Sequence, residues 1–372
     1  MGSFLRQRPR VLIACGGTGG HLFPGLAVAE ELRQRGHDIL LLISRKQIDS
    51  RALKDSDWSF EILSTEEGLQ SRSPVAVARF VGGMLLGTLG SLRILNRCKA
   101  DLVLGMGGFL SFGPTLAGRL LGKPTLIHES NAIPGKANRL TARFATRVLL
   151  GFEECARHFS GRDCEVVGTP VRAHMRSPQD SHAARRALGL PEEAPLLLAM
   201  GGSQGAHGIN ELVSRSAGLL KDAGFSVAHI SGVADEKMVR ERYGRSGLPH
   251  FVAAFSDRMD QLMSAASVAV SRSGAASLAE LAAMRLPALL IPYPHAAEDH
   301  QTRNAEIFVS RGAAVCLAEA QATPEDLLAW ALRINGPEGE SLRQHLAGLH
   351  AGTAHERVAD TVERLLNEKR LV

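Results

Sequence analysis

Short apolar runs bounded by glycine turns alternate along this chain with longer mixed segments of helical character. Val11–Cys15, Ile39–Ile43 and Leu102–Leu104 are typical of buried strands, because a strand that is covered on both faces carries apolar residues without alternation. The segment after the first strand predicts a helix that runs to about Arg35, with Pro24 in its first turn. This order of elements predicts an α/β fold with doubly wound parallel sheets.

The same pattern starts again in the second half of the chain. Leu196–Met200 predicts a strand and is followed by the turn Gly201–Gly205 and a helix, just as the first strand is followed by the turn Gly16–Gly20. Two matching strand–turn–helix units indicate an internal repeat of a half-molecule. We predict two similar domains and a C-terminal helix that packs back towards the first domain, with the boundaries 1–170, 171–345 and 346–372.

Length and composition are those of a globular protein. The chain has 372 residues, of which 45% are hydrophobic and 22% are charged, and this suits two domains better than one core. No uninterrupted apolar run reaches the roughly 18 residues of a membrane-spanning helix. The five cysteines are scattered and form no C-x-x-C pair, which is typical of a reduced compartment without a structural metal. We therefore expect a cytoplasmic protein.

Charge is distributed unevenly along the chain. Residues 1–170 carry 22 Lys and Arg against 15 Asp and Glu, whereas the remainder carries 21 against 23. A basic first half predicts an anionic partner such as a phosphate group, a nucleic acid or an acidic lipid surface. Nucleic acid is not favoured, because the chain has 5% aromatic residues and no stacking motif.

The first glycine turn is the main chemical candidate in the first half. Its backbone N–H groups, at the start of a helix, would form a nest for a diphosphate, although tight turns of small residues are also common in α/β folds. His21 follows the turn directly and is a candidate for taking a proton from an attacking hydroxyl. The dinucleotide pattern G-x-G-x-x-G is not met, because Leu22 stands at the third glycine position. Ser44–Lys46 also carries no acidic group where such enzymes place one, so a dehydrogenase is a disfavoured alternative.

The second half holds a matching candidate. Val268–Ser271 predicts a strand, and the small residues within Arg272–Glu280 would offer helix N–H groups to a second diphosphate contact. Glu280 lies about two helical turns further on, where its carboxylate would accept hydrogen bonds from a ribose. After the strand Ala288–Ile291 comes the polar loop Pro292–Asn304, which has the composition of a catalytic loop or of an ordinary connection.

Seven motifs, spread in order over nearly the whole chain, carry a family resemblance: GGTGGHLFPGLAVAEEL, GMGGFLSFGP, HESNAIPGKANR, VGTPVR, GGSQGAHGIN, SRSGAASLAE and PYPHAAEDHQTRNA. Together they resemble the peptidoglycan N-acetylglucosaminyltransferases that convert lipid I to lipid II. The resemblance implies a GT-B fold, with two Rossmann-like domains and the active site in the cleft between them. It implies an inverting, metal-independent hexosyltransferase without a cofactor. The donor would be UDP-N-acetylglucosamine, and the acceptor would be undecaprenyl-diphosphate-linked muramoyl pentapeptide.

The resemblance assigns acceptor-side roles to the first domain. Thr18, Gly19 and Gly20 would lie near the transferred sugar and the acceptor diphosphate. His21 and Glu129 are the acid–base candidates, and the choice between them stays open.

Donor contacts follow from the same resemblance. Asn131 and Gln301 would contact the donor sugar, and Arg172 and Ser203 would face the diphosphate. The backbone of Ser256 would bind the uracil. The diphosphate and the ribose would be held by Ala275, Ala276, Ser277, Leu278, Ala279 and Glu280.

Two positions depart from the family pattern. Phe109 replaces a Tyr in the motif GGFLS, and Ser130 replaces a Gln in the motif HESN, so a hydroxyl and an amide are absent from the expected acceptor side. A UDP-N-acetylglucosamine epimerase shares the architecture and is a second alternative, but it would have no need of a basic, apolar acceptor face.

A D-x-D motif at Asp55 and Asp57 matches the pattern with which many sugar transferases hold a divalent metal. It precedes the strand Ser59–Leu63 instead of following one. We therefore predict a surface turn there and no metal site.

The uncharged segment Phe80–Leu92 is bracketed by Arg79 and Arg93 and is too short to span a bilayer. As a helix, it would leave Leu86 on the outer side between the two arginines. We predict that the first domain attaches reversibly to the anionic cytoplasmic face of the inner membrane as a peripheral protein. One apolar half of the helix would pack on the sheet, namely Val77, Phe80, Val81, Met84, Leu85, Leu89 and Leu92.

Overall fold

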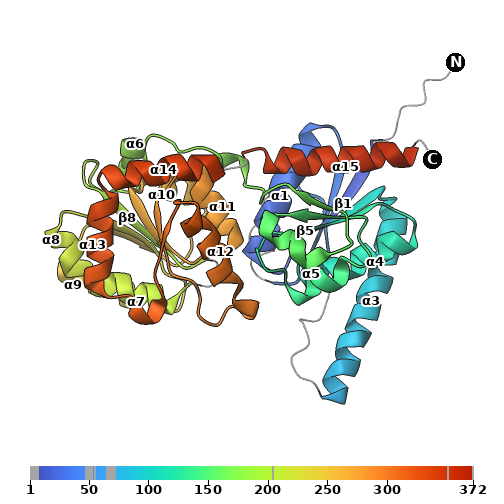
Figure 1. Cartoon of the computed structure of the whole chain (residues 1–372), viewed down its shortest axis with the longest axis horizontal. Helices are drawn as coiled ribbons and strands as arrows, with labels where there is room; N and C mark the ends of the chain where they lie inside the picture. The colour runs from blue at the N-terminus through green and yellow to red at the C-terminus, as the bar shows by residue number, and fades with distance from the viewer. Residues whose placement is uncertain are drawn as a thin grey trace. The chain divides into compact units, whose positions relative to one another are not determined.

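The chain divides into two compact units, unit 1 (Met1–Arg172 with Thr353–Val372) and unit 2 (Ala173–Gly352). The structure is a computed structural model that describes residues 8–46, 53, 56–63, 73–202, 205–349 and 352–370. Each unit is built on one sheet in which every strand pair is parallel, with helices packed against it (Figure 1). The predicted fold class, two doubly wound α/β domains, is confirmed.

Unit 1 contains a seven-stranded sheet in the order β3-β2-β1-β4-β5-β6-β7. Alternate residues of β1 face opposite sides of this sheet: Val11 and Ile13 pack with α1 and α15, whereas Leu12 and Ala14 pack with α3 and α4. Both faces are therefore covered, as the unbroken apolar runs predict. The elements are β1 Arg10–Ala14, α1 Gly19–Gln34, β2 Asp38–Ile43, β3 Phe60–Ile62, α3 Pro74–Cys98, β4 Leu102–Gly105, η1 Phe109–Ser111, α4 Phe112–Leu120, β5 Thr125–Glu129, α5 Lys136–Thr141, β6 Arg147–Leu150, η2 Glu153–Phe159, β7 Cys164–Val166 and α15 Ala354–Arg370.

Unit 2 repeats this plan with a six-stranded sheet in the order β10-β9-β8-β11-β12-β13. Its elements are η3 Ala173–Met175, α6 Ser181–Ala187, β8 Leu196–Met200, α7 His207–Arg215, α8 Ala217–Asp222, β9 Ser226–Ile230, α9 Glu236–Ser246, β10 His250–Ala253, α10 Met259–Ala265, β11 Val268–Ser271, α11 Ala275–Ala283, β12 Ala288–Leu290, η4 Ala297–Asp299, α12 His300–Ser310, β13 Val315–Cys316, η5 Glu319–Gln321, α13 Pro324–Ile334 and α14 Pro337–Leu349.

In each sheet the strand order reverses at one place, between β1 and β4 in unit 1 and between β8 and β11 in unit 2. Open α/β sheets bind ligands at the carboxyl ends of the strands that flank such a switch point. All four of these strands are followed by glycine-containing segments, which in the described residues are 15–18, 106–108, 201–202 with 205–206, and 272–274. Both units therefore place their predicted diphosphate nests at their own switch point.

The sequence predicted the start of the first helix incorrectly. Helix α1 begins at Gly19, so Pro24 lies inside the helix and not in its first turn. The helix starts early because the Thr18 carbonyl accepts the N–H groups of His21 at 3.1 Å and Leu22 at 3.0 Å, well before the proline. Pro24 removes one N–H further along the same helix.

Helix α15 belongs to unit 1 although it follows all of unit 2 in sequence. The predicted C-terminal helix is present over Ala354–Arg370, within the predicted segment 346–372. Arg35 at the end of α1 forms ion pairs with Asp360 at 2.6 Å and Glu363 at 3.0 Å. The apolar face of α15 joins the core around β1 and α1 through Val358, Ala359, Val362, Leu365 and Leu366.

Helix α3 packs on unit 1 by its C-terminal half, where three small residues and two large ones are buried. Gly87, Thr88, Ser91, Ile94 and Leu95 are its buried residues. A Cβ on Gly113 of α4 would lie 2.9 Å from the Gly87 carbonyl carbon, so the two helices approach closely at glycine. The prediction that the large apolar half packs on the sheet is wrong for most of its residues, although Leu92 does pack against the core.

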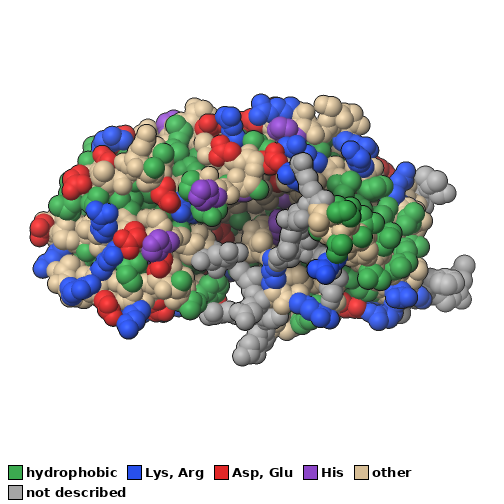
Figure 2. Space-filling view, turned by 90° about the horizontal axis from the view of Figure 1, so that it is seen from below, with side chains coloured by type: hydrophobic (Ala, Val, Ile, Leu, Met, Phe, Trp, Pro, Cys, Tyr) green, Lys and Arg blue, Asp and Glu red, His purple; other side chains and the backbone are tan. Residues whose placement is uncertain are grey.

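Most of that apolar half is exposed to solvent. Leu86 is 70% exposed and Leu85 is 60% exposed, and the other exposed apolar residues of the helix are Val75, Val77, Val81 and Leu89. The N-terminal part of α3 projects from unit 1 in Figure 1, and Figure 2 shows hydrophobic side chains gathered on that face with Lys and Arg around them. Among the described residues, α3 is the one helix whose length and composition would suit a membrane span, which by itself is weak evidence of one.

Candidate active site

The first glycine turn joins β1 directly to α1. Gly17 has a φ of +102°, a conformation that favours glycine. A Cβ on Gly25 would lie 2.3 Å from the Cys15 Cβ, so α1 meets the end of β1 where no side chain fits. Thr18 is the N-cap of α1, but its side chain does not cap the helix. The backbone N–H groups of Gly19 and Gly20 therefore begin the helix without a side-chain cap, as an anion nest requires.

His21 is held between this turn and the turn after β4. Its Nδ1 lies 3.2 Å from the Thr18 hydroxyl. A Cβ on Gly107 would lie 2.9 Å from the His21 Nε2, and a Cβ on Gly108 would lie 3.1 Å from its Cε1. Both glycines have positive φ angles, +112° and +71°. The structure thus brings His21 and the second glycine turn together across the switch point, which the sequence had placed only as separate motifs.

Ser111 fixes the shape of that second turn and was not recognised from the sequence. Its hydroxyl donates to the Gly107 carbonyl at 2.8 Å and accepts the Gly107 N–H at 3.0 Å. The serine is fully buried, at 0% exposure. The sequence signal that could have identified Ser111 was its position four residues after Gly107, at the start of a helix.

Glu129 ends β5 and is buried under four N–H donors. Its Oε1 accepts the backbone N–H of Asn131 at 2.9 Å and the side-chain amide of the same residue at 3.0 Å. Its Oε2 accepts the Gly135 N–H at 3.1 Å and the Asn138 amide at 2.8 Å. Burial raises the pKa of the Glu129 carboxyl, and these hydrogen bonds oppose the rise. The carboxylate therefore braces the loop from Ser130 to Gly135, and it holds Asn131 at the end of β5.

His128 and Ser130 form a second buried pair beside Glu129. The Gly168 carbonyl lies 2.8 Å from the His128 Nε2, so this nitrogen donates to it. The Nδ1 accepts the Ser130 hydroxyl at 3.2 Å. Burial lowers the pKa of His128 to about 4, so the ring is neutral at physiological pH. Ser130, a departure from the family pattern, thus acts within the protein and points its hydroxyl at His128.

Arg172 stacks on the first helix of its own unit. Its guanidinium carbon lies 4.0 Å from the centroid of the Phe23 ring. An arginine over an aromatic face is held in place while its charge is kept. The structure therefore puts the Arg172 charge beside α1, the helix that begins at the first glycine turn.

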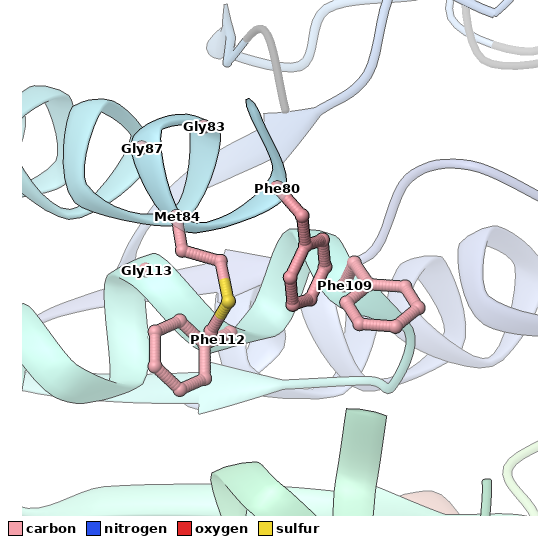
Figure 3. Close-up of a pocket in the computed structure, with 7 residues that line it drawn as sticks. All are labelled: Phe80, Gly83, Met84, Gly87, Phe109, Phe112 and Gly113. Carbon is pink, nitrogen blue, oxygen red and sulfur yellow. The ribbon is translucent and has the colours of Figure 1, made fainter. Parts of the chain in front are cut away.

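Phe109, the other departure from the family pattern, turns its ring towards α3. The rings of Phe109 and Phe80 meet edge to face with centroids 5.4 Å apart. Figure 3 shows the apolar pocket that they line together with Met84 and Phe112. A Phe ring suits this apolar setting, because it carries no hydroxyl that would need a hydrogen-bond partner there.

In unit 2, helix α11 begins at the switch point with Gly274 as its N-cap, and no side chain caps it. Ala275 and Leu278 are buried in the core, so they can contribute only backbone groups to a ligand. Glu280 is half-buried two turns in. The segment therefore has the predicted form, with N–H groups at its start and a carboxylate further on. The remaining members of the segment, Ala276, Ser277 and Ala279, are also half-buried.

Gln301 lies in the first turn of α12 and is tied to the start of α11. Its backbone carbonyl accepts the Ser273 hydroxyl at 2.8 Å, and its side-chain Oε1 accepts the Tyr293 N–H at 3.0 Å. The Asn304 amide donates to the Ser273 carbonyl at 3.0 Å. The structure thus joins the two motifs SRSGAASLAE and PYPHAAEDHQTRNA. Sequence reasoning missed Ser273 and Asn304 as the residues that join them.

The remaining predicted positions are Ser256, Ser203 and the D-x-D motif. Ser256 follows β10, and its hydroxyl accepts the Arg258 N–H at 3.1 Å. Ser203 and Asp55 lie outside the described residues. Asp57 is exposed, and both of its oxygens accept hydrogen bonds from Arg33 at 3.0 Å. These hydrogen bonds lower the pKa of the Asp57 carboxyl. In the described part of the chain, no three His, Cys, Asp or Glu side chains gather as metal ligands.

Known proteins resemble both halves of the chain. The glycosyltransferase family 28 N-terminal domain matches residues 11–150, and the C-terminal domain of that family matches residues 196–362. A protein from Synechococcus elongatus is 38% identical over 97% of this chain and 97% of its own length. It is named UDP-N-acetylglucosamine–N-acetylmuramyl-(pentapeptide) pyrophosphoryl-undecaprenol N-acetylglucosamine transferase. The crystal structure of Acinetobacter baumannii MurG matches with a TM-score of 0.73 and 26% identity, over 96% of this chain and 99% of that one. The chain belongs to the MurG family of glycosyltransferases.

Membership of the MurG family confirms the family resemblance and the GT-B fold that it implied. A relative of the same name from Pelobacter propionicus is 36% identical over 88% of this chain and 91% of its own. A Listeria monocytogenes protein described as a UDP-N-acetylglucosamine 2-epimerase has a TM-score of 0.70 at 15% identity, over 97% of both chains, and shares the fold alone. The epimerase and dehydrogenase alternatives are not favoured by these comparisons.

Proposed function

We propose that this chain transfers N-acetylglucosamine, with inversion, from UDP-N-acetylglucosamine to the C4 hydroxyl of the muramoyl sugar in undecaprenyl-diphosphate-linked muramoyl pentapeptide. Members of the MurG family are hexosyltransferases, and relatives named for this transfer match the chain over nearly its full length. The observation that carries the proposal is that the switch-point helices of both units start without a side-chain cap, with His21 at one of them and Glu280 behind the other.

In the proposed reaction, His21 acts as the base. A tautomer with Nδ1–H donating to the Thr18 hydroxyl leaves the lone pair on Nε2 for the proton of the C4 hydroxyl. The hydroxyl oxygen then bonds to C1 of the sugar as the bond from C1 to the UDP oxygen breaks. Glu129 is a weaker candidate, because both of its oxygens already accept two N–H donors each.

UDP departs as an anion and needs positive charge around its diphosphate. We assign this role to the start of α11 and to Arg172 and Ser203, with Ser256 at the uracil. Uncapped helix N–H groups and a guanidinium stabilise developing negative charge without a proton transfer. We assign Asn131 and Gln301 to the donor sugar and Thr18, Gly19 and Gly20 to the acceptor diphosphate.

The direct test is a donor screen with radiolabelled nucleotide sugars and a lipid-linked muramoyl acceptor. We expect transfer from UDP-N-acetylglucosamine and from no other donor at a comparable rate. Transfer from a different nucleotide sugar, or none from this donor, would overturn the proposed function.

Replacing Glu280 with Ala should weaken UDP binding about 10- to 100-fold, because hydrogen bonds to a charged group contribute roughly 1.5–3 kcal/mol. Calorimetric titration with UDP measures the effect. Glu325→Ala, an exposed carboxylate on α13, is the matched control and should bind UDP like the parent. Unchanged UDP affinity in folded Glu280→Ala would remove the ribose assignment.

We also propose that unit 1 attaches to the membrane as a peripheral protein, through the exposed apolar face of α3 on the cytoplasmic side. Leu85, Leu86 and Leu89 on this face are each at least half exposed. Exposed Arg79 and Arg93 lie on the same helix, and each basic residue near an anionic leaflet contributes about 1 kcal/mol of attraction. The buried residues of α3 keep it on α4, so the exposed leucines are left for lipid.

Changing Leu86, Arg79 and Arg93 together to Glu should abolish sedimentation with anionic phospholipid vesicles at low salt. Transfer to the natural lipid acceptor should slow, whereas transfer to a short-chain soluble analogue should be kept, because these side chains are exposed and lie outside the predicted catalytic turn. Val233→Glu, at an 86% exposed position in unit 2, is the control. Equal vesicle binding by the triple variant and the parent would exclude this face.

A further inference from the structure

Arg272 is a buried arginine that no part of the proposed chemistry uses. It follows β11 directly, and only 6% of the residue is exposed. Its Nη1 donates to the carbonyls of Ile291 at 3.1 Å and Pro292 at 3.2 Å. Its guanidinium carbon also lies 5.4 Å from the centroid of the Tyr293 ring. Arg272, at the end of β11, therefore holds the backbone of residues 291–293, which follow the neighbouring strand β12.

Glu319 balances the charge of Arg272. Its carboxylate comes from η5, after β13, and lies 2.5 Å from the Arg272 Nη2. A Cβ on Gly208 would lie 2.3 Å from this carboxylate, so the first turn of α7 also rests against Glu319. A carboxylate at that end of a helix is favourable. Three segments that follow β8, β11 and β13 thus meet at one ion pair.

The chain of contacts continues from Arg272 to Gln301. Arg272 fixes the backbone before Tyr293, and the Tyr293 N–H holds the Gln301 side-chain oxygen at 3.0 Å. Because that oxygen accepts a hydrogen bond from the protein, the group that Gln301 presents to a ligand is its NH₂, a donor. The orientation of this amide thus depends on where residues 291–293 lie.

We propose that Arg272 and Glu319 are positioning residues that hold residues 291–293 so that the Gln301 amide donates to the sugar of the donor. The inference rests on the proposed function for the identity of that donor. Residues Arg272–Gly274 join β11 to α11, and the diphosphate contacts assigned to the start of α11 are backbone N–H groups, which the two side chains of the ion pair do not supply. Loss of the pair should therefore affect binding of the sugar more than binding of the nucleotide.

Calorimetry with two ligands, UDP and UDP-N-acetylglucosamine, separates these effects. Glu319→Gln and Arg272→Lys should each weaken UDP-N-acetylglucosamine at least tenfold and UDP less than threefold. Lysine keeps the charge but has no planar fork with which to hold two carbonyls and a carboxylate at once. Steady-state kinetics should show KM for the donor rising as kcat falls.

Arg333→Lys is the matched control, because Arg333 is an exposed arginine of α13 whose partner is Glu338. It should change neither affinity. The double variant Arg272→Lys with Glu319→Gln should cost less than the sum of the two single changes, since both act through the same contacts. Equal weakening of both ligands, or no weakening of either, would overturn the positioning role. Should the parent bind UDP but not UDP-N-acetylglucosamine, the proposed function fails instead.

Discussion

Replacing His21 with Ala is expected to lower kcat by roughly 10²- to 10⁴-fold, the usual cost of removing a general base. The affinity for UDP should stay close to that of the parent, since the nucleotide contacts are assigned chiefly to unit 2. Initial rates with a soluble short-chain acceptor, at saturating donor, measure the effect without a contribution from membrane binding. The reason is local: His21 is held by the Thr18 hydroxyl and lies against Gly107 and Gly108 at the switch point.

His158→Ala is the control for this experiment, because His158 belongs to unit 1 but lies in η2, away from both glycine turns. It should leave kcat unchanged. The outcome that would contradict the assignment is a large rate loss in folded Glu129→Gln together with a small one in His21→Ala. In that case the carboxylate, and not the imidazole, would take the proton.

Acidification from pH 7 to pH 5 is expected to cost each unit about 2 kcal/mol of unfolding free energy through one buried histidine. Burial lowers the pKa of His128 in unit 1 to about 4 and that of His229 in unit 2 to about 3, from an ordinary value of 6.5. Below pH 6.5 the unfolded chain binds a proton that the folded chain does not. Stability is therefore complete above that pH and falls as the pH drops towards 4 and 3, by about 1.4 kcal/mol per pH unit.

The two buried rings make the same pattern of hydrogen bonds, in which Nε2 donates to an oxygen and Nδ1 accepts from a hydroxyl. His229 donates from Nε2 to the Asn210 side-chain oxygen at 2.9 Å, and its Nδ1 accepts the Tyr243 hydroxyl at 2.7 Å. Urea unfolding of the parent, His128→Asn and His229→Asn at pH 7 and pH 5 provides the test. Between pH 7 and pH 5, the free energy of unfolding of each variant should fall by about 2 kcal/mol less than that of the parent, whatever the stability of the variant at pH 7. An unchanged difference would mean that the replaced ring is not neutral in the folded protein.

The sequence predicted the elements that depend on local pattern. Val268–Ser271 and Leu196–Met200 were predicted as strands with the bounds that the structure shows, because a strand buried on both faces is an unbroken apolar run. The glycine turns were found because a chain that enters a helix directly from a strand needs small residues there. The place of these turns at the switch points came only with the strand order.

Helix α3 shows where the pattern fails. A helical wheel finds an apolar half but does not say what covers it, and the structure instead buries a different set of residues in the C-terminal half of α3, from Gly87 to Leu95. The contact between Gly87 and Gly113 decides this, and it joins residues from two different helices. Burial of Arg272 could not be predicted for a similar reason, since Ile291, Pro292 and Glu319, to which it bonds, lie 19 to 47 residues further along the chain.

The return of α15 to unit 1 affects how the protein is made. The ribosome completes the whole of unit 2 before it synthesises the helix that fills the core around β1 and α1. Until then the first 172 residues lack five apolar side chains of that core and expose the surface that these side chains will cover. Unit 2, which is continuous in sequence, can fold as it emerges, whereas unit 1 waits for a segment made after it. The N-terminal half of the enzyme is therefore the later of the two to reach its final state, and nascent chains are most exposed to chaperones and proteases there.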